Sequence, residues 1–199
     1  MARTVDPVKH RAKRLQIAHA AARLFAAQGY EATTISQICR AAGISAGSLF
    51  HYFPSKRDLF AAIITDDGDG DTAHALAAAM AADDPLAGLL DFVDHLAAAA
   101  AEPIVPGLVL EAMLQARRDP DLAQLMGDDA DAEHAGVTAL LARAADLGAI
   151  DADLDVEATA AWLMAMVGAF YLQAATDERF APDQQLPLLR RTCRRLLAP

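Results

Sequence analysis

The stretch from residue 33 to residue 59 decides the fold of this 199-residue chain; it reads TTISQICRAAGISAGSLFHYFPSKRDL. The hydroxyl of Thr34 can cap a short helix, and Gly43 can end that helix because glycine adopts a positive φ without strain. Ser45 can cap a second short helix, which closes before Pro54 because the residue preceding a proline is pushed out of the helical region. Two short helices joined by a tight glycine turn meet the requirements of a helix-turn-helix.

The side chains of this stretch divide into an inner and an outer set. Small or apolar residues that can lock the second short helix against the first are Cys39, Ala42, Ile44, Leu49 and Phe53. The outward face of the second helix then carries Ser45, Ala46, Ser48, His51 and Tyr52. This division predicts a helix held from behind and free to contact a partner in front.

The flanking sequence also has helical periodicity. Apolar residues recur at three- and four-residue steps from Val8 to Gln28, and Gly29 stops that helix. Ser55 followed by Asp58 predicts the start of a fourth helix. The polar Gly/Asp run over residues 66–71 either kinks this helix or ends it, and we favour a kink. Further helices are expected at about 84–101, 105–118, 121–147, 155–176 and 184–197. No useful length alternates with period two, so the fold class is all-α.

The charge of the chain is unevenly distributed. Its formal net charge is −10, yet residues 1–60 carry nine basic and three acidic side chains, so they are positive by six. The rest of the chain is negative by sixteen, and a basic head on an acidic body indicates a head that meets a polyanion. Five basic residues at the start can contact phosphates or the minor groove, or can belong to a solvated terminus: Arg3, Lys9, Arg11, Lys13 and Arg14.

Together, the paired threonines, the AAG turn, the SLFHYF helix and the FPSK junction resemble the DNA-binding domain of the TetR family of bacterial transcriptional regulators. The resemblance covers about the first 60 residues. It implies a three-helix DNA-binding domain over residues 1–54 and a helical effector-binding and dimerisation domain over residues 55–199, with about nine helices in all. Double-stranded DNA is then the expected partner.

The resemblance also implies which residues meet the DNA, with the second short helix in the major groove. The candidate DNA-binding residues are Thr34, Ser36, Ser45, Ala46, Gly47, Ser48, Phe50, His51, Tyr52 and Lys56. Phe50 stands where the family most often has tyrosine, so one hydroxyl contact to the backbone is missing. Residues 44–53 contain no Arg, Lys, Asn or Gln, and specificity is therefore expected to depend on hydroxyl and methyl contacts, on Gln37 or Arg40, and on DNA shape.

One head reads only a few base pairs, so a homodimer on a palindromic operator is expected. Candidate interface residues in the last two helices are Trp162, Met166, Gly168, Phe170, Leu189 and Leu196. By the same resemblance the body holds an effector pocket, and its candidate lining is Phe92, His95, Leu110, Met113, Leu114, Met126 and Trp162. Such a lining favours a small hydrophobic effector.

Other function classes have less support. No catalytic or phosphate-loop motif stands out, so neither an enzyme nor a cofactor is expected, and no metal site is assigned. Two alternatives stay open: a DNA-binding scaffold without effector, and a metal-responsive regulator that uses Asp91, His95 and a third ligand. The uncharged run from residue 158 to 176 is long enough for a membrane span, but its alanine content and flanking acids favour a packed helix. Without a signal peptide, and with Cys39 and Cys193 far from any pairing motif, a cytoplasmic location is expected.

Overall fold

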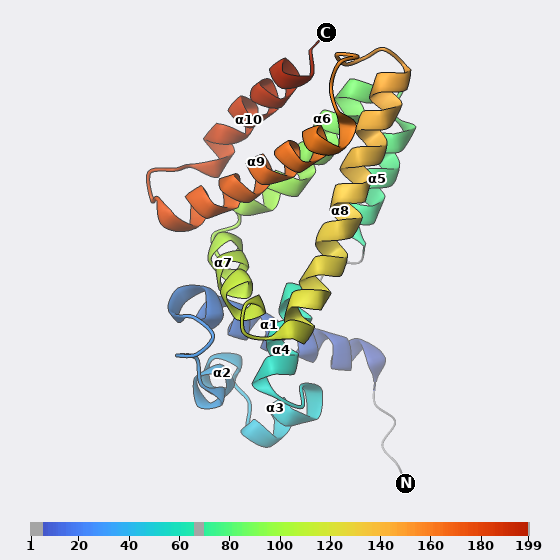
Figure 1. Ribbon diagram of the computed structural model, residues 1–199. Helices are drawn as coiled ribbons and strands as arrows, with labels where there is room; N and C mark the ends of the chain where they lie inside the picture. The colour runs from blue at the N-terminus through green and yellow to red at the C-terminus, as the bar shows by residue number, and fades with distance from the viewer. Residues whose placement is uncertain (1–5, 66–69, 199) are drawn as a thin grey trace. The chain divides into compact units, whose positions relative to one another are not determined.

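The computed structural model describes residues 6–65 and 70–198, and within these ranges it contains only helices and turns (Figure 1). The helices are α1 (Pro7–Gln28), α2 (Ile35–Ala42), α3 (Ala46–Tyr52), α4 (Lys56–Ile64), α5 (Asp71–Ala81), α6 (Pro85–Ala98), the 3-10 helix η1 (Ala99–Ala101), α7 (Val105–Ala116), α8 (Pro120–Asp146), α9 (Val156–Thr176) and α10 (Pro182–Leu197). The all-α prediction is therefore confirmed.

The chain forms two compact units. Among the described residues, unit 1 comprises 6–65 and 107–123, and unit 2 comprises 70–106 and 124–198. Unit 1 thus contains α1 to α4 together with most of α7 and the start of α8. The division that we expect between residues 54 and 55 stays a prediction.

Local capping signals account for the helix starts in unit 1. The side chains of Asp6, Thr34, Ser45 and Ser55 each accept hydrogen bonds from backbone N–H groups in the first turn of the helix that follows. Thr34 forms a full capping box with Gln37, whose side chain accepts a hydrogen bond from the Thr34 N–H at 2.8 Å. Each capping side chain lies within three residues of the N–H groups from which it accepts, so these signals can be read from the local sequence.

The core of unit 1 combines all of its first four helices. Its largest fully buried side chains include Ile17, Phe25, Ile38, Leu49, Phe53, Leu59 and Phe60. Tyr30 adds a ring to this core, since its centroid lies 5.6 Å from that of Phe25 and 5.1 Å from that of Phe60. Burial of these rings orders α1 to α4 around a single centre.

The expectation that the fourth helix continues through a kink was wrong, as the described residues on either side of the run show. α4 ends at Ile64, with Thr65 as its C-cap, and α5 begins separately at Asp71 after Gly70 in the left-handed conformation. The polar Gly/Asp run therefore separates two helices. Residues 66–69 themselves lie outside the described residues.

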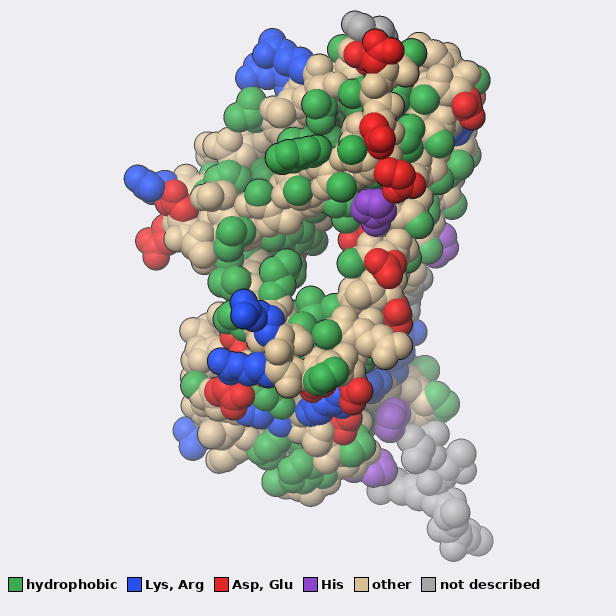
Figure 2. All heavy atoms as spheres, viewed as in Figure 1, with side chains coloured by type: hydrophobic (Ala, Val, Ile, Leu, Met, Phe, Trp, Pro, Cys, Tyr) green, Lys and Arg blue, Asp and Glu red, His purple; other side chains and the backbone are tan. Residues whose placement is uncertain are grey.

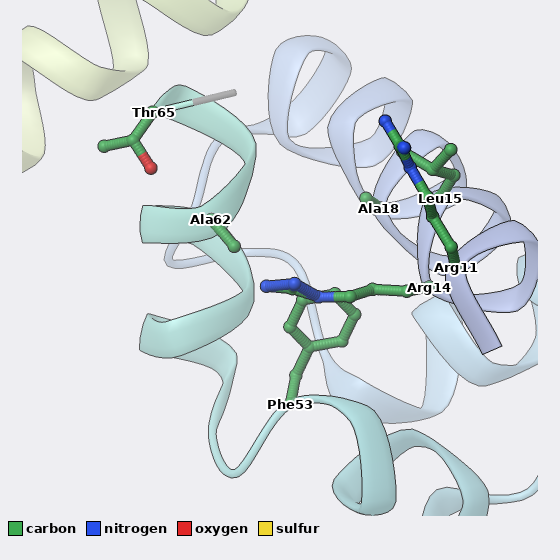
Figure 3. A pocket seen from close by; sticks show the side chains of 7 residues that line it. All are labelled: Arg11, Arg14, Leu15, Ala18, Phe53, Ala62 and Thr65. Carbon is green, nitrogen blue, oxygen red and sulfur yellow. The ribbon is translucent and has the colours of Figure 1, made fainter. Parts of the chain in front are cut away.

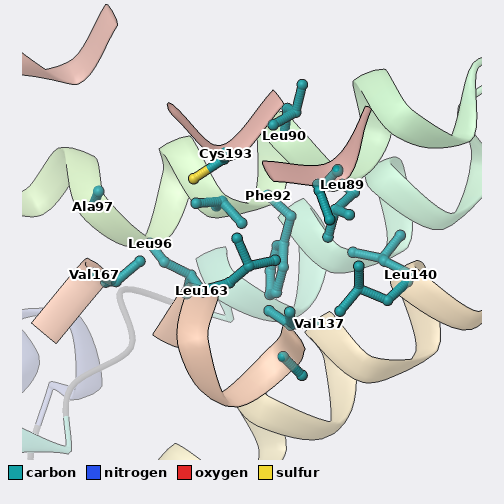
Figure 4. Packing of buried hydrophobic residues seen from close by; sticks show 14 of the residues in the cluster. Leu89, Leu90, Phe92, Leu96, Ala97, Val137, Leu140, Leu163, Val167 and Cys193 are labelled. Atoms are coloured by element: carbon teal, nitrogen blue, oxygen red, sulfur yellow. The ribbon is translucent and has the colours of Figure 1, made fainter. Parts of the chain in front are cut away.

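Unit 2 is built around α6, which packs against α5, α9 and α10. Figure 4 shows apolar side chains of α6, α8, α9 and α10 converging on one core. Gly88 permits the closest approach, because a Cβ at that position would lie 2.4 Å from the carbonyl oxygen of Ala79 on α5. Outside the core, Arg190 of α10 pairs with Asp91 and Asp94 of α6, with a 2.7 Å contact to Asp91.

Within unit 2, α9 buries only one stripe of side chains: Thr159, Ala160, Leu163, Val167 and Phe170. Among the described helices, α9 is the single helix that is long and apolar enough to cross a membrane. Of its most apolar 18-residue stretch, 28% is buried inside the chain. A single helix of this kind is weak evidence for a span, since core helices share its composition. Outside this buried stripe, α9 carries Trp162, which is 68% exposed.

Candidate nucleic-acid interface

The turn between α2 and α3 has the geometry that the sequence predicts. Gly43 adopts φ 63° and ψ 42°, the left-handed conformation that favours glycine. The N–H of Ile44 donates to the carbonyl of Cys39 at 3.0 Å, which closes the turn. Ala42 is buried, and its carbonyl accepts a hydrogen bond from the side-chain amide of Gln16 at 3.1 Å. The turn is thus tied to α1 as well as to α2.

The recognition helix α3 is held by its inner face. Leu49 is fully buried and Phe53, its C-cap, is 2% exposed. The exposed side chains and glycine of the outer face are Ser45, Ala46, Gly47, Phe50 and His51, while Ser48 and Tyr52 are half-buried. The seven candidates on this helix therefore lie together on or beside a single outward surface, with Phe50 46% exposed.

Two hydroxyls on or near this surface form hydrogen bonds within the helix caps. The Oγ of Ser45 accepts a hydrogen bond from the Ser48 N–H at 3.2 Å as the N-cap of α3. The hydroxyl of Thr34 donates to the Gln37 side chain at 2.8 Å. Ser36 is exposed on α2, next to this cap. A capping serine hydroxyl keeps its own O–H free to donate, so Ser45 can both cap the helix and reach an acceptor on DNA.

Tyr52 sits in a small aromatic group at the end of α3. Its ring centroid lies 4.7 Å from that of His10 on α1 and 5.3 Å from that of His51. His10 was not among the sequence candidates, because it lies 42 positions from Tyr52 and nothing local signals the contact. The group places three rings with polar atoms beside the outer face of α3.

Lys56 is engaged inside unit 1. Its ammonium donates to the carbonyls of Tyr30 at 2.9 Å and Thr33 at 3.0 Å, and it lies 4.1 Å from the centre of the Tyr30 ring. An ammonium has three N–H donors, so one remains for a phosphate oxygen. Lys56 therefore stabilises the loop before α2 and can contact DNA only through its remaining donor.

Two further polar links bind α7 and the start of α8 to the first four helices, and the sequence predicts neither of them. Arg57 of α4 donates to Asp119 at 2.8 Å and to Asp121 at 3.0 Å. The hydrogen bond from Arg57 lowers the pKa of Asp119 to about 2. The carboxylate of Glu111 on α7 accepts the Tyr30 N–H at 2.9 Å and the Gln115 side-chain amide at 2.8 Å. No local sequence pattern signals pairs so distant in the chain.

The basic residues before α1 and in its first turns do not behave alike. Lys9 is exposed and lies 3.5 Å from Asp6, and Lys13 donates to Gln16 at 3.2 Å. Arg14 extends over the ring of Phe53, with its guanidinium carbon 4.7 Å from the ring centre. Arg3 lies outside the described residues.

The candidate effector residues are divided between the units. Leu110, Met113 and Leu114 belong to unit 1, where Met113 and Leu114 are about half exposed, while the other four belong to unit 2. Of those four, Phe92 is buried in the core beside His95, with ring centroids 6.4 Å apart. Met126 is half-buried and Trp162 is exposed.

The candidate dimer residues are also heterogeneous. Phe170 and Leu189 are buried in the core of unit 2, and Phe170 packs against Phe180 at 5.0 Å between ring centroids. Met166 and Gly168 are half-buried. Exposed apolar residues on the two helices are Trp162, Leu172, Leu188 and Leu196. Figure 2 shows hydrophobic side chains gathered on the surface over α9.

Comparison with known proteins agrees with this geometry. Residues 17–63 match the family model of bacterial regulatory proteins of the tetR family, and residues 85–198 match that of the C-terminal domain of BetI-type transcriptional repressors. The chain is 29% identical over 163 residues, 82% of each chain, to the HTH-type transcriptional repressor AcnR of Corynebacterium efficiens.

Solved structures show the same fold. GusR of Salmonella enterica matches with a TM-score of 0.71 and 26% identity, covering 98% of each chain. A putative transcriptional regulator of Saccharomonospora viridis in complex with choline matches with a TM-score of 0.78 and 19% identity, covering 95% of this chain and 99% of that one. The predicted helix-turn-helix and the two family models lead to one conclusion: the chain belongs to the TetR family of bacterial DNA-binding transcriptional regulators.

Proposed function

We propose that the chain is a cytoplasmic repressor that binds a palindromic operator as a homodimer and is released by a small hydrophobic effector. The outer face of α3 is the observation that carries this proposal. Its exposed serine, alanine, glycine and histidine residues stand on a helix held by fully buried Leu49 and nearly buried Phe53. We assign the chain no enzymatic activity and no cofactor.

Recognition of the operator's base sequence would depend on contacts from short polar and apolar side chains. Ser45 and Ser48 can exchange hydrogen bonds with base edges, Ala46 can meet a thymine methyl group, and Gly47 has no atom within 4 Å of a Cβ built on it. His51 can meet a base or a phosphate. Tyr52, Lys56, Thr34 and Ser36 suit phosphate oxygens, which position the helix without reading sequence. Phe50 offers apolar contact with sugar or methyl groups.

The homodimer is supported by the exposed apolar faces of α9 and α10. Trp162 is 68% exposed, and Leu172, Leu188 and Leu196 are each more than 40% exposed. Exposed aromatic and aliphatic side chains on adjacent helices are typical of an association surface. We therefore centre the proposed interface on these four, with Met166 and Gly168 beside them; Phe170 and Leu189 support it from within the core.

The effector is proposed to be small and hydrophobic because most of its candidate lining is apolar. The structural neighbour from Saccharomonospora viridis was solved with choline, which shows that a similar fold accommodates a small molecule. A scaffold without effector is the alternative that needs no pocket. No observation supports the metal-responsive alternative. Asp91 forms an ion pair with Arg190, and in the described ranges no group of three His, Cys, Asp or Glu residues could hold a metal ion.

Titration of fluorescently labelled DNA from the region flanking the chain's own gene tests the operator proposal. We expect saturable binding whose affinity falls steeply with salt, because phosphate contacts release counterions. Tyr52→Phe and Lys56→Ala should each weaken binding by about tenfold, the value of one charge-assisted phosphate contact. The salt slope should fall by about one for Lys56→Ala.

Two controls keep this test specific. Arg179→Ala also removes one positive charge, but Arg179 lies in the turn before α10, where it pairs with Asp177. This variant should leave the affinity for DNA unchanged. Thermal unfolding of Lys56→Ala separates lost phosphate contact from a disturbed loop, because Lys56 also holds two carbonyls. Undiminished binding by both test variants would overturn the assigned surface.

A further inference from the structure

We infer that unit 1 carries a small-molecule site of its own, a pocket between α1 and α4 that fits a small amphipathic carboxylate. None of its lining residues is among the candidate effector residues. The pocket measures about 370 Å³, at the small end of the range of roughly 300–1,000 Å³ for ligand sites. Its lining consists of Arg11, Arg14, Leu15, Ala18, Phe53, Ala62 and Thr65 (Figure 3).

Arg14 provides the anion-binding group. Figure 3 shows its side chain leaving α1 and crossing the face of Phe53 toward Ala62 on α4. In the described ranges Arg14 donates no hydrogen bond and forms no ion pair; the structure records only its ring contact. A guanidinium stacked on a ring keeps its N–H groups in the guanidinium plane, where they can take a carboxylate in bidentate fashion.

Phe53 holds this arginine in place. The ring is 2% exposed and belongs to the buried core of unit 1, so it presents a fixed surface. A long arginine side chain resting on a fixed ring loses less freedom on binding an anion than one that moves freely in water. Arg11 lines the same pocket.

The remaining wall selects an apolar body. Ala18 on α1 and Ala62 on α4 are small, which leaves space between the helices, and Leu15 is 37% exposed beside them. A ligand with a short hydrocarbon or ring would cover these side chains while its carboxylate meets Arg14. Inorganic phosphate shares the negative charge but leaves the apolar wall uncovered, so it should bind more weakly.

Isothermal titration calorimetry on the full chain without DNA tests this site, using octanoate, benzoate, octanol and inorganic phosphate as probes. We expect saturable binding of octanoate or benzoate with a dissociation constant at or below about 1 mM, and at least tenfold weaker binding of octanol and phosphate. Arg14→Gln, which removes the charge, should weaken carboxylate binding at least tenfold. Ala62→Met, which fills the pocket, should do the same.

Arg23→Gln is the matched control, because Arg23 is exposed on the same helix but does not line the pocket. It should bind the carboxylates like the wild type. Undiminished carboxylate binding by Arg14→Gln would place the ligand elsewhere and overturn the proposal, as would no saturable binding by the wild type up to about 10 mM. Equal binding of phosphate and octanoate would also overturn it. Arg14→Gln and Ala62→Met alter only the lining of this pocket, so they distinguish binding here from binding of the same probes at the proposed effector pocket.

Discussion

Single residues in this chain decide how closely two helices can approach. Gly88 of α6 faces the carbonyl of Ala79 at the end of α5, and a Cβ there would also lie 3.0 Å from the Ala82 Cβ. Gly127 of α8 is likewise inside a helix but has no atom within 4 Å of a Cβ built on it. The two glycines look alike in the sequence and differ only in what surrounds them.

Gly88→Ala is therefore expected to destabilise the protein by about 1–3 kcal/mol, the usual cost of forcing an atom into a packed contact. Gly127→Ala should leave stability unchanged or raise it by up to about 1 kcal/mol, because alanine favours the helix. Urea unfolding followed by circular dichroism measures both changes. Equal stability of the two variants would show that α5 and α6 do not approach as closely as the structure shows.

At the scale of elements, unit 1 joins segments that are distant in the chain. Arg57 in the first turn of α4 links to Asp119, which immediately precedes α8. Glu111 on α7 accepts the backbone N–H of Tyr30 after α1. A Cβ on Gly107 would lie 3.1 Å from the carbonyl oxygen of Ala26, so α7 also packs closely against the end of α1. Polar links and close packing together attach α7 to the head.

The Arg57–Asp119 link predicts a specific pH dependence. Arg57 lowers the pKa of Asp119 from 3.8 to about 2 in the folded state. The link therefore stabilises the folded state fully at pH values above 3.8, the pKa of an unpaired aspartate. That contribution is lost as the pH falls through about 2 and both states become protonated. Asp119→Asn should therefore be less stable than the wild type near neutral pH, and the difference should shrink below pH 3.8.

The urea midpoint measured across this pH range checks the prediction. Asp128→Asn, at an exposed position of α8, removes one carboxylate without removing this link, and its difference from the wild type should stay nearly constant. If Asp119→Asn shows an equally constant difference, the link does not lower the pKa in solution.

At the scale of the whole molecule, the exposed apolar surface of unit 2 is the surface that the proposed homodimer would cover. Trp162 is the only tryptophan of the chain, and it lies at 68% exposure on α9. Leu188 on α10 is 46% exposed. A homodimer that covers both helices would remove these side chains from water, which is the main driving force for association.

If the proposed homodimer forms through this face, Leu188→Glu is expected to make the protein monomeric, because a carboxylate would have to be buried without a partner. Sedimentation equilibrium should then report about half the wild-type mass, and the Trp162 emission should shift to longer wavelength as its ring returns to water. Leu125→Glu, at a leucine of α8 that is 42% exposed, is the matched control and should stay dimeric. A dimeric Leu188→Glu would remove this face from the proposed interface.

Prediction from the sequence succeeded where its signals are local. The capping side chains, the left-handed Gly43 and the apolar spacing of α1 each act within a few residues, so the helix-turn-helix could be read directly. The expected kink was wrong, because α4 ends at Ile64 and α5 begins at Asp71; glycine and aspartate are compatible with a kink or a break, so local composition does not choose between them. The engagement of Lys56 was also missed, since its acceptors are backbone carbonyls that every sequence contains.

The sequence by itself determined the all-α fold class, the three-helix head and the face of α3 that points outward, because short-range capping and periodicity specify them. Only the tertiary structure decided that α7 joins the head through Glu111, that Arg57 meets Asp119, and that Arg14 rests on Phe53 above a pocket. These contacts join positions 39 to 81 residues apart. Their energy depends on distance in space, which no local pattern of residues encodes.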